Sequence, residues 1–147
     1  MSGNWARVAA AELSPERRPP ADRSISTDKN WAGFDYLLRR RGFPVDIVFG
    51  EETFPGTTPG DEFSEGTWGY GPPTYLTPER VAEAARALAA LSPADLIRGV
   101  TPDDVTAADR YSFHPDDLLD VAAELPPAQE FFAAAAAAGD AVLCWLD

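Results

Sequence analysis

The chain has 147 residues, 45% of them hydrophobic, a composition that predicts one folded domain over residues 1–147 rather than a disordered segment. Asp and Glu total 24 against 12 Lys and Arg, so the formal net charge is −12 at pH 7. An acidic field of this size repels nucleic-acid phosphates and anionic membrane surfaces, so we expect neither as a partner. It would attract a basic protein surface. The alternative explanation is that the charge only keeps the protein soluble.

The cysteine content and the hydropathy pattern argue against disulfide-bonded, cysteine-zinc, secreted and membrane-spanning proteins. With a single cysteine, Cys144, the chain can form neither an intramolecular disulfide nor a cysteine-based zinc site. The opening MSGNWARV has neither the basic region nor the apolar core of a signal peptide. The longest uncharged apolar run, FFAAAAAAG, is far shorter than the roughly 18–20 residues that span a bilayer. The sequence therefore predicts a soluble, cytoplasmic protein.

The first elements are a short strand and a connection. Residues 4–8, NWARV, are predicted to form a first strand. Residues 16–25 contain a proline pair that cannot continue a helix, and we interpret them as an irregular, exposed connection.

The segment STDKNWAGFDYLLRRRGFP predicts the first long helix. Trp31, Phe34 and Leu38 recur at spacings of three and four, which places them on one face of a helix. Thr27 or Asp28 is expected to cap its first N–H groups. Three arginines near its end suit the negative end of the helix dipole, and the glycine after them suits a left-handed cap.

The middle of the chain is rich in glycine and proline. PVDIVFGEETF is ambiguous between a strand and a single helical turn, and residues 55–66 are predicted to form a polar loop. In the stretch TWGYGPPTYLTPERV, Gly69 and Gly71 permit backbone conformations that other residues avoid, while two prolines stiffen the chain. We interpret this stretch as a rigid turn that delivers Tyr75 to the start of the next helix and roofs the core with its aromatic rings.

Three consecutive Ser/Thr-Pro pairs, at Thr77, Ser92 and Thr101, each predict the start of a helix. Two further helices are expected in HPDDLLDVAAELPP and PAQEFFAAAAAAG, separated near Pro126. The terminal DAVLCWLD is nearly all apolar, as in a strand buried on both faces. The fold class predicted is therefore α+β: a small, mostly antiparallel or mixed sheet with the C-terminal strand central, covered by several short helices.

Three segments resemble one family. GYGPPTYLTPERV is similar to the GYGPARYLTPEEV of the YfbM-like family, a bacterial domain-of-unknown-function family. DKNWAGFDYLL and AGDAVLCWLD resemble its DKAWHGLHYLL and EGNAVLLWID, in the same order and spacing. The resemblance implies an α+β domain of intracellular bacterial proteins with no established activity. This sequence has Ala32 and Asp35 where the family has two histidines, so chemistry resting on those imidazoles is absent here.

The residue types used for catalysis are scarce. The only imidazole, His114, precedes a proline at a predicted helix start, and Cys144 lies in the apolar terminal strand, so both are interpreted as structural. The sequence has no recognisable metal motif, and GTWGYGPPT lacks the Lys and Ser/Thr of a phosphate loop. We therefore expect no catalytic residue, no metal and no cofactor. Of the carboxylate pairs, only Glu51 and Glu52 lie outside a predicted first helical turn.

The leading hypothesis is a non-enzymatic, acidic protein-interaction module, with an immunity-type inhibitor of a basic toxin domain as one version. Its expected anchors are Trp68, Tyr70 and Tyr75, because aromatic residues carry much of the binding energy of interfaces. Its expected acidic rim consists of Glu51, Glu52, Asp61, Glu62 and Glu65. The alternative is a small-ligand binder or hydrolase-like enzyme with a pocket beside the WGYGPP turn, where Tyr70, Tyr75, Glu51 or Asp35 would orient the substrate.

Overall fold

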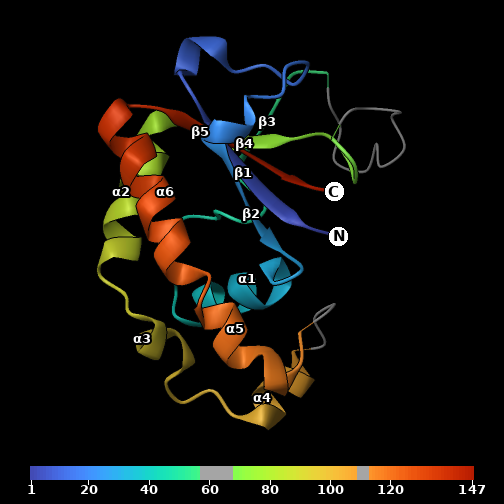
Figure 1. The fold of residues 1–147 in the computed structure, drawn as a ribbon, viewed down its shortest axis with the longest axis vertical. Coiled ribbons are helices and arrows are strands. Elements are labelled where there is room, and N and C mark those ends of the chain that lie inside the picture. Colours follow the sequence, from blue (N-terminus) through green and yellow to red (C-terminus); the bar gives the residue numbers. More distant parts are fainter. Residues whose placement is uncertain (57–67, 109–112) are drawn as a thin grey trace.

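A sheet that joins both ends of the chain forms the centre of the molecule (Figure 1). The computed structural model describes residues 1–56, 68–108 and 113–147. Within these ranges five strands pair in the order β2-β1-β5-β4-β3, every pair antiparallel. The strands are β1 (Gly3–Val8), β2 (Ser24–Asp28), β3 (Glu52–Thr53), β4 (Thr74–Leu76) and β5 (Ala141–Leu146).

The central strand is β5, as the apolar terminal run predicted. Cys144 lies opposite Trp5 of β1 on one side and opposite Thr74 of β4 on the other. Residues 141–145 are all buried, since helices cover one face of the sheet and loops cover the other. The expected α+β architecture with a central C-terminal strand is confirmed.

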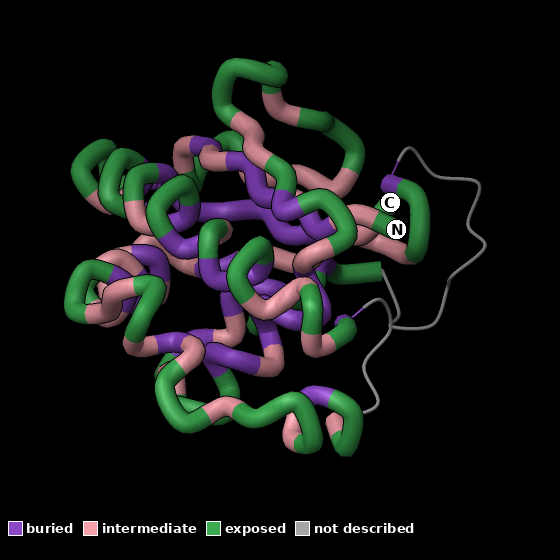
Figure 2. The backbone as a smooth tube through the Cα atoms, turned by 60° about the horizontal axis from the view of Figure 1, so that its bottom comes forward, coloured by how far each residue is buried: buried purple, intermediate pink, exposed green. Residues whose placement is uncertain are grey.

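Helices α2 and α6 pack side by side against the sheet, and the shorter helices continue below them (Figure 1). In Figure 2 the buried backbone concentrates in the central strands and on the inner sides of the helices. None of the described helices is long and apolar enough to cross a bilayer. The helices are α1 (Trp31–Arg40), α2 (Pro78–Ala89), α3 (Pro93–Ile97), α4 (Pro102–Ala107), α5 (Leu118–Ala122) and α6 (Leu125–Ala138), with 3-10 turns η1 (Ala10–Glu12), η2 (Ala21–Arg23) and η3 (Pro115–Asp117).

The three Ser/Thr-Pro helix starts are confirmed. The hydroxyl of Thr77 accepts a hydrogen bond from the backbone N–H of Arg80, two residues inside α2. Reciprocal capping boxes open α3 and α4, where the cap hydroxyl and an aspartate three residues later satisfy each other's backbone N–H groups. These caps fix the residue at which each of the three helices begins.

The predicted cap of the first helix is wrong. Thr27 and Asp28 belong to β2, and the buried Thr27 hydroxyl donates to the Gly3 carbonyl. Asn30 precedes α1 without a side-chain cap. The interpretation of residues 16–25 as irregular is wrong at its end, because β2 begins at Ser24 and pairs with β1. Tertiary pairing decides this short strand, and local sequence carries little sign of it.

The ambiguous segment after α1 consists mainly of turns, and it ends in β3. We call residues 43–51 the 43–51 loop. Its buried Ile47 carbonyl accepts hydrogen bonds from the indole Nε1 of Trp5 and, at 3.5 Å, from the Sγ of Cys144. Farther along, the Asp46 carboxylate accepts from the Phe49 N–H at 3.0 Å. The loop is therefore fixed to the two central strands without being a strand itself.

Replacing Trp5 by Phe removes a donor from a buried carbonyl, which costs about 1–3 kcal/mol, in addition to the ring volume lost. We expect the free energy of unfolding in urea to fall more for Trp5→Phe than for Trp31→Phe. The control makes the same ring exchange where the indole donates to the terminal Met1 carbonyl. Equal losses in both variants would contradict the role given to the Ile47 contact.

Candidate functional site

A surface cavity of about 290 Å³ lies beside the turn at residues 70–73, next to the end of β5. We call it the Tyr70 cavity. One wall comes from the 43–51 loop, another from the turn, and its floor from β5. Its lining is mostly apolar: Val48, Phe49, Thr53, Tyr70, Gly71, Pro72, Pro73, Thr74, Cys144, Trp145 and Leu146.

The turn is shaped by its glycines and by contact with β5. Gly69 and Gly71 have φ values of +83° and +100°, which side chains rarely tolerate. A Cβ on Gly69 would lie only 2.6 Å from the Cα of Asp147, so the backbone itself packs on the end of the sheet. The Tyr70 N–H donates to the Leu146 carbonyl at 2.9 Å. The Tyr70 side chain consequently projects outward and is 60% exposed.

The three aromatic residues predicted as anchors occupy different environments. Trp68 is buried: its indole donates to the Pro15 carbonyl, and its ring meets Trp145 edge-on at 5.1 Å. Tyr75 is half-buried in β4, with its ring 4.8 Å from that of Phe54. Of the three, only Tyr70 exposes most of its side chain and lines the cavity.

Glu51 and Glu52 have separate environments. Both Glu51 oxygens accept hydrogen bonds from Arg80 of α2, each at 2.8 Å, and these bonds hold the pKa of the Glu51 carboxyl below its ordinary value of 4.5. Arg80 also donates to the Pro44 carbonyl, so the ion pair joins the 43–51 loop to α2. Glu52 is exposed on β3. The predicted rim residues Asp61, Glu62 and Glu65 lie outside the described residues.

Asp35 is only 3% exposed and lies in α1. The Arg39 Nε contacts its two oxygens at 2.9 and 3.0 Å, and the Arg39 Nη2 reaches Asp46 at 2.7 Å. These groups and Glu51 line a second cavity of about 220 Å³, which also takes part of its lining from the 43–51 loop. Asp35 does not line the Tyr70 cavity, so the predicted set Tyr70, Glu51 and Asp35 is not brought together.

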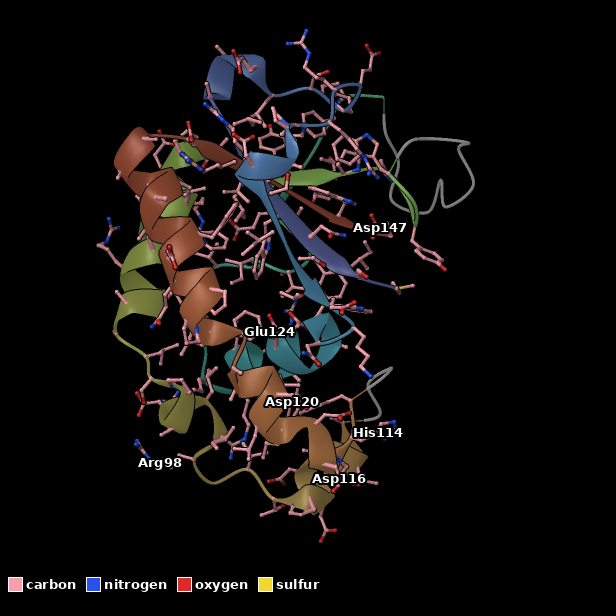
Figure 3. The ribbon with its side chains drawn as sticks, in the orientation of Figure 1. Arg98, His114, Asp116, Asp120, Glu124 and Asp147 are labelled. Carbon is pink, nitrogen blue, oxygen red and sulfur yellow. The ribbon has the colours of Figure 1, made fainter. Side chains whose placement is uncertain are left out.

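The one imidazole lies away from the Tyr70 cavity, and the one thiol, which lines the cavity, is unreactive. Figure 3 places His114 beside η3, well apart from Asp147 at the end of β5. Burial raises the pKa of the Cys144 thiol well above its ordinary value, which keeps it protonated. Within the described residues, no three His, Cys, Asp or Glu side chains gather in a way that could hold a metal ion.

Sequence reasoning did not predict the part of the Tyr70 cavity lining that comes from the 43–51 loop and β3. Phe49 and Thr53 line the Tyr70 cavity but lie in the segment that the sequence left ambiguous. Thr74, which donates its hydroxyl hydrogen to the Phe49 carbonyl, joins these walls to β4. The one local signal for this wall was Phe49, which precedes a Gly-Glu-Glu sequence. A large apolar residue beside polar turn residues indicates that its ring contacts another part of the molecule.

The Glu51–Arg80 pair predicts a pH dependence of stability. A carboxyl whose pKa is lowered by folding stabilises the protein above its unfolded pKa, and this contribution is lost as the pH falls below about 4.5. We expect Glu51→Gln to lower the free energy of unfolding by about 1 kcal/mol at pH 7, a difference that shrinks towards pH 3. The adjacent Glu52→Gln should have little effect at either pH. A pH-independent loss in Glu51→Gln would show that the ion pair is not its source.

Comparison with known proteins identifies the family. Residues 4–145 match the family model described as Domain of unknown function (DUF1877). Among solved structures, the fold is similar to that of a protein of unknown function, YfbM from Escherichia coli, with a TM-score of 0.62, 14% identity and 100% of each chain covered. No curated protein matches the chain. At that identity the likeness shows a shared fold alone. The resemblance seen in the three sequence motifs is confirmed, and the chain belongs to the DUF1877 family.

Proposed function

We propose that this chain is a non-enzymatic recognition module that binds a basic protein partner, one of whose apolar side chains enters the Tyr70 cavity. The cavity is the observation that carries the proposal. Its volume of about 290 Å³ is at the lower end of small-molecule pockets, which span roughly 300–1,000 Å³. It therefore suits one large side chain better than an extended cofactor.

Tyr70 is placed as an interface anchor would be. It is 60% exposed and lies at the wall of a preformed apolar cavity, held there by a backbone hydrogen bond to β5. Tyrosine supplies a large contact area with little side-chain entropy to lose, and such residues dominate the binding energy of many interfaces. Trp68 would contribute indirectly, because its ring packs edge-on against Trp145 of the cavity lining.

The charge favours a basic partner. The net charge of −12 would speed encounter with a positive surface and penalise an acidic one. Glu52 is exposed on β3, but neighbouring strand residues point to opposite faces, so its carboxylate lies on the other face from the cavity wall residue Thr53 and acts through the long-range field alone. A basic toxin domain is one partner of this kind, and binding would then inhibit it.

Binding suits the cavity better than catalysis does. Its lining has no Asp, Glu, His, Lys or Arg among the described residues, and the lining residue Cys144 has a buried, protonated thiol that donates a hydrogen bond to the Ile47 carbonyl. General acid–base catalysis needs a titrating group within hydrogen-bond reach of the substrate. Among the described lining residues, the Tyr70 phenol and the Cys144 thiol are the groups of this kind, and no carboxylate, imidazole or amine lies in the lining to assist them.

The same cavity supports a second candidate, a small apolar ligand. The turn and the 43–51 loop give it walls on several sides, as in a ligand site. Indole is a suitable probe, because it also represents a tryptophan side chain. Saturable indole shifts of the Leu146 and Val48 methyl resonances would support an open cavity in solution, and a lack of shifts would weaken both candidates. Binding of a small metabolite without any protein partner would favour the second.

Removing the Tyr70 ring should weaken capture of the partner. We expect immobilised wild-type protein to retain a basic protein from native lysate at low salt and to release it as salt rises. Tyr70→Ser should weaken this retention by tenfold or more, about 1.4 kcal/mol or above. The readout is the amount of that protein bound, measured by quantitative mass spectrometry.

The matched control is Leu119→Ser, which removes a 72%-exposed apolar side chain from α5. It should leave the retention unchanged, because α5 does not border the cavity. Equal retention by wild type and Tyr70→Ser, or a partner whose binding does not respond to salt, would refute the proposal.

A further inference from the structure

A different cavity, of about 260 Å³, gathers positive charge on this strongly acidic chain. It lies between the end of β1 and the connection that leads to β2, and we call it the arginine cavity. Figure 1 shows this connection as the dark blue segment beyond the sheet, at the opposite end of the molecule from α4. The lining residues are Val8, Glu12, Arg17, Arg18, Pro19, Pro20 and Arg23.

Two of these arginines lack an internal partner. Among the described residues, no side-chain hydrogen bond or ion pair involves Arg17 or Arg23, and both are exposed. Arg18 covers the rings of Trp68 and Trp145, at 5.2 and 5.6 Å. Of the ten described arginines, five pair with a carboxylate: Arg7, Arg18, Arg39, Arg80 and Arg98. Arg18 does so with Asp147 at 3.9 Å, and Glu12 is the one carboxylate in the cavity lining beside the three arginines.

The backbone around the cavity is fixed before any ligand binds. Two prolines restrict the chain at positions 19 and 20, and the Pro20 carbonyl accepts hydrogen bonds from the Arg23 N–H at 3.0 Å and the Ser24 hydroxyl at 3.2 Å. The Pro15 carbonyl is held by the indole of the buried Trp68. A preformed site loses less conformational entropy when it is filled.

We infer that the arginine cavity binds a small oxyanion, a phosphate or carboxylate group carried on a compact organic body. The guanidinium fork presents paired N–H donors that match these groups in bidentate fashion. Val8 and the two prolines offer an apolar wall to the rest of the ligand. The surrounding charge of −12 opposes long polyanions, so the site favours a ligand small enough to be held by the local arginines.

This inference is independent of the proposed protein partner, because the arginine cavity and the Tyr70 cavity share no lining residue. The two proposals are therefore tested separately, by anion titration for the arginine cavity and by partner capture for the Tyr70 cavity.

The test is a titration of the whole chain with inorganic phosphate and, separately, with succinate, at constant ionic strength. Backbone NMR shifts of residues 8–24 report on the site. We expect saturable binding of at least one anion with a Kd of about 1 mM or tighter, and the preferred anion identifies the ligand chemistry. An Arg17→Gln/Arg23→Gln variant should bind at least about tenfold more weakly, because charge-assisted hydrogen bonds are lost.

A Lys29→Gln/Arg86→Gln variant is the matched control, since it removes the same charge from two exposed residues outside the cavity. It should bind the anion as the wild type does. The inference is overturned if neither anion saturates the site, if the arginine variant keeps its affinity, or if both variants lose affinity equally. All the substituted side chains are exposed, and circular dichroism would verify that both variants fold.

Discussion

The buried Ile47 carbonyl ties the 43–51 loop to the centre of the sheet. A carbonyl removed from water needs a donor, and Ile47 receives two, from Trp5 in β1 and Cys144 in β5. The 43–51 loop, which has little regular structure of its own, is thereby fixed to the centre of the sheet. Both the Tyr70 cavity and the carboxylate-lined cavity take a wall from this loop. The one cysteine thus serves as a structural donor rather than as a nucleophile.

The arginines of this acidic chain have two different kinds of surroundings, which the net charge does not reveal. Arg39 and Arg80 form ion pairs within the molecule. They neutralise Asp35, Asp46 and Glu51 and fix the 43–51 loop to α1 and α2. The Tyr70 cavity carries no described charged side chain in its lining, whereas the arginine cavity concentrates three guanidinium groups. The apolar lining and the group of arginines therefore lie at separate places on one acidic molecule.

Local signals were predictable from sequence, and signals that depend on distant partners were not. The helix starts at Ser92 and Thr101 were predictable because four consecutive residues contain each whole capping interaction. The strand β2 was missed because its pairing with β1 decides it. The burial of Trp68 depends on the Pro15 carbonyl and Arg18, and the difference between Glu51 and Glu52 depends on Arg80. The turn that presents Tyr70 was predictable from its glycines and prolines, but the opposite wall at Phe49 was not.

The pairing of β1 with β5 sets the order in which the chain can fold. Gly3 lies opposite Leu146, so the central ladder joins segments from the two ends of the sequence. Closing so large a loop costs entropy that only the completed ladder and its buried faces offset. During synthesis the capped helices can form as they emerge, but β1 has no β5 to pair with until residues 141–146 have been made. Until then Trp5 lacks its full surroundings, and the apolar face of β1 stays in contact with water.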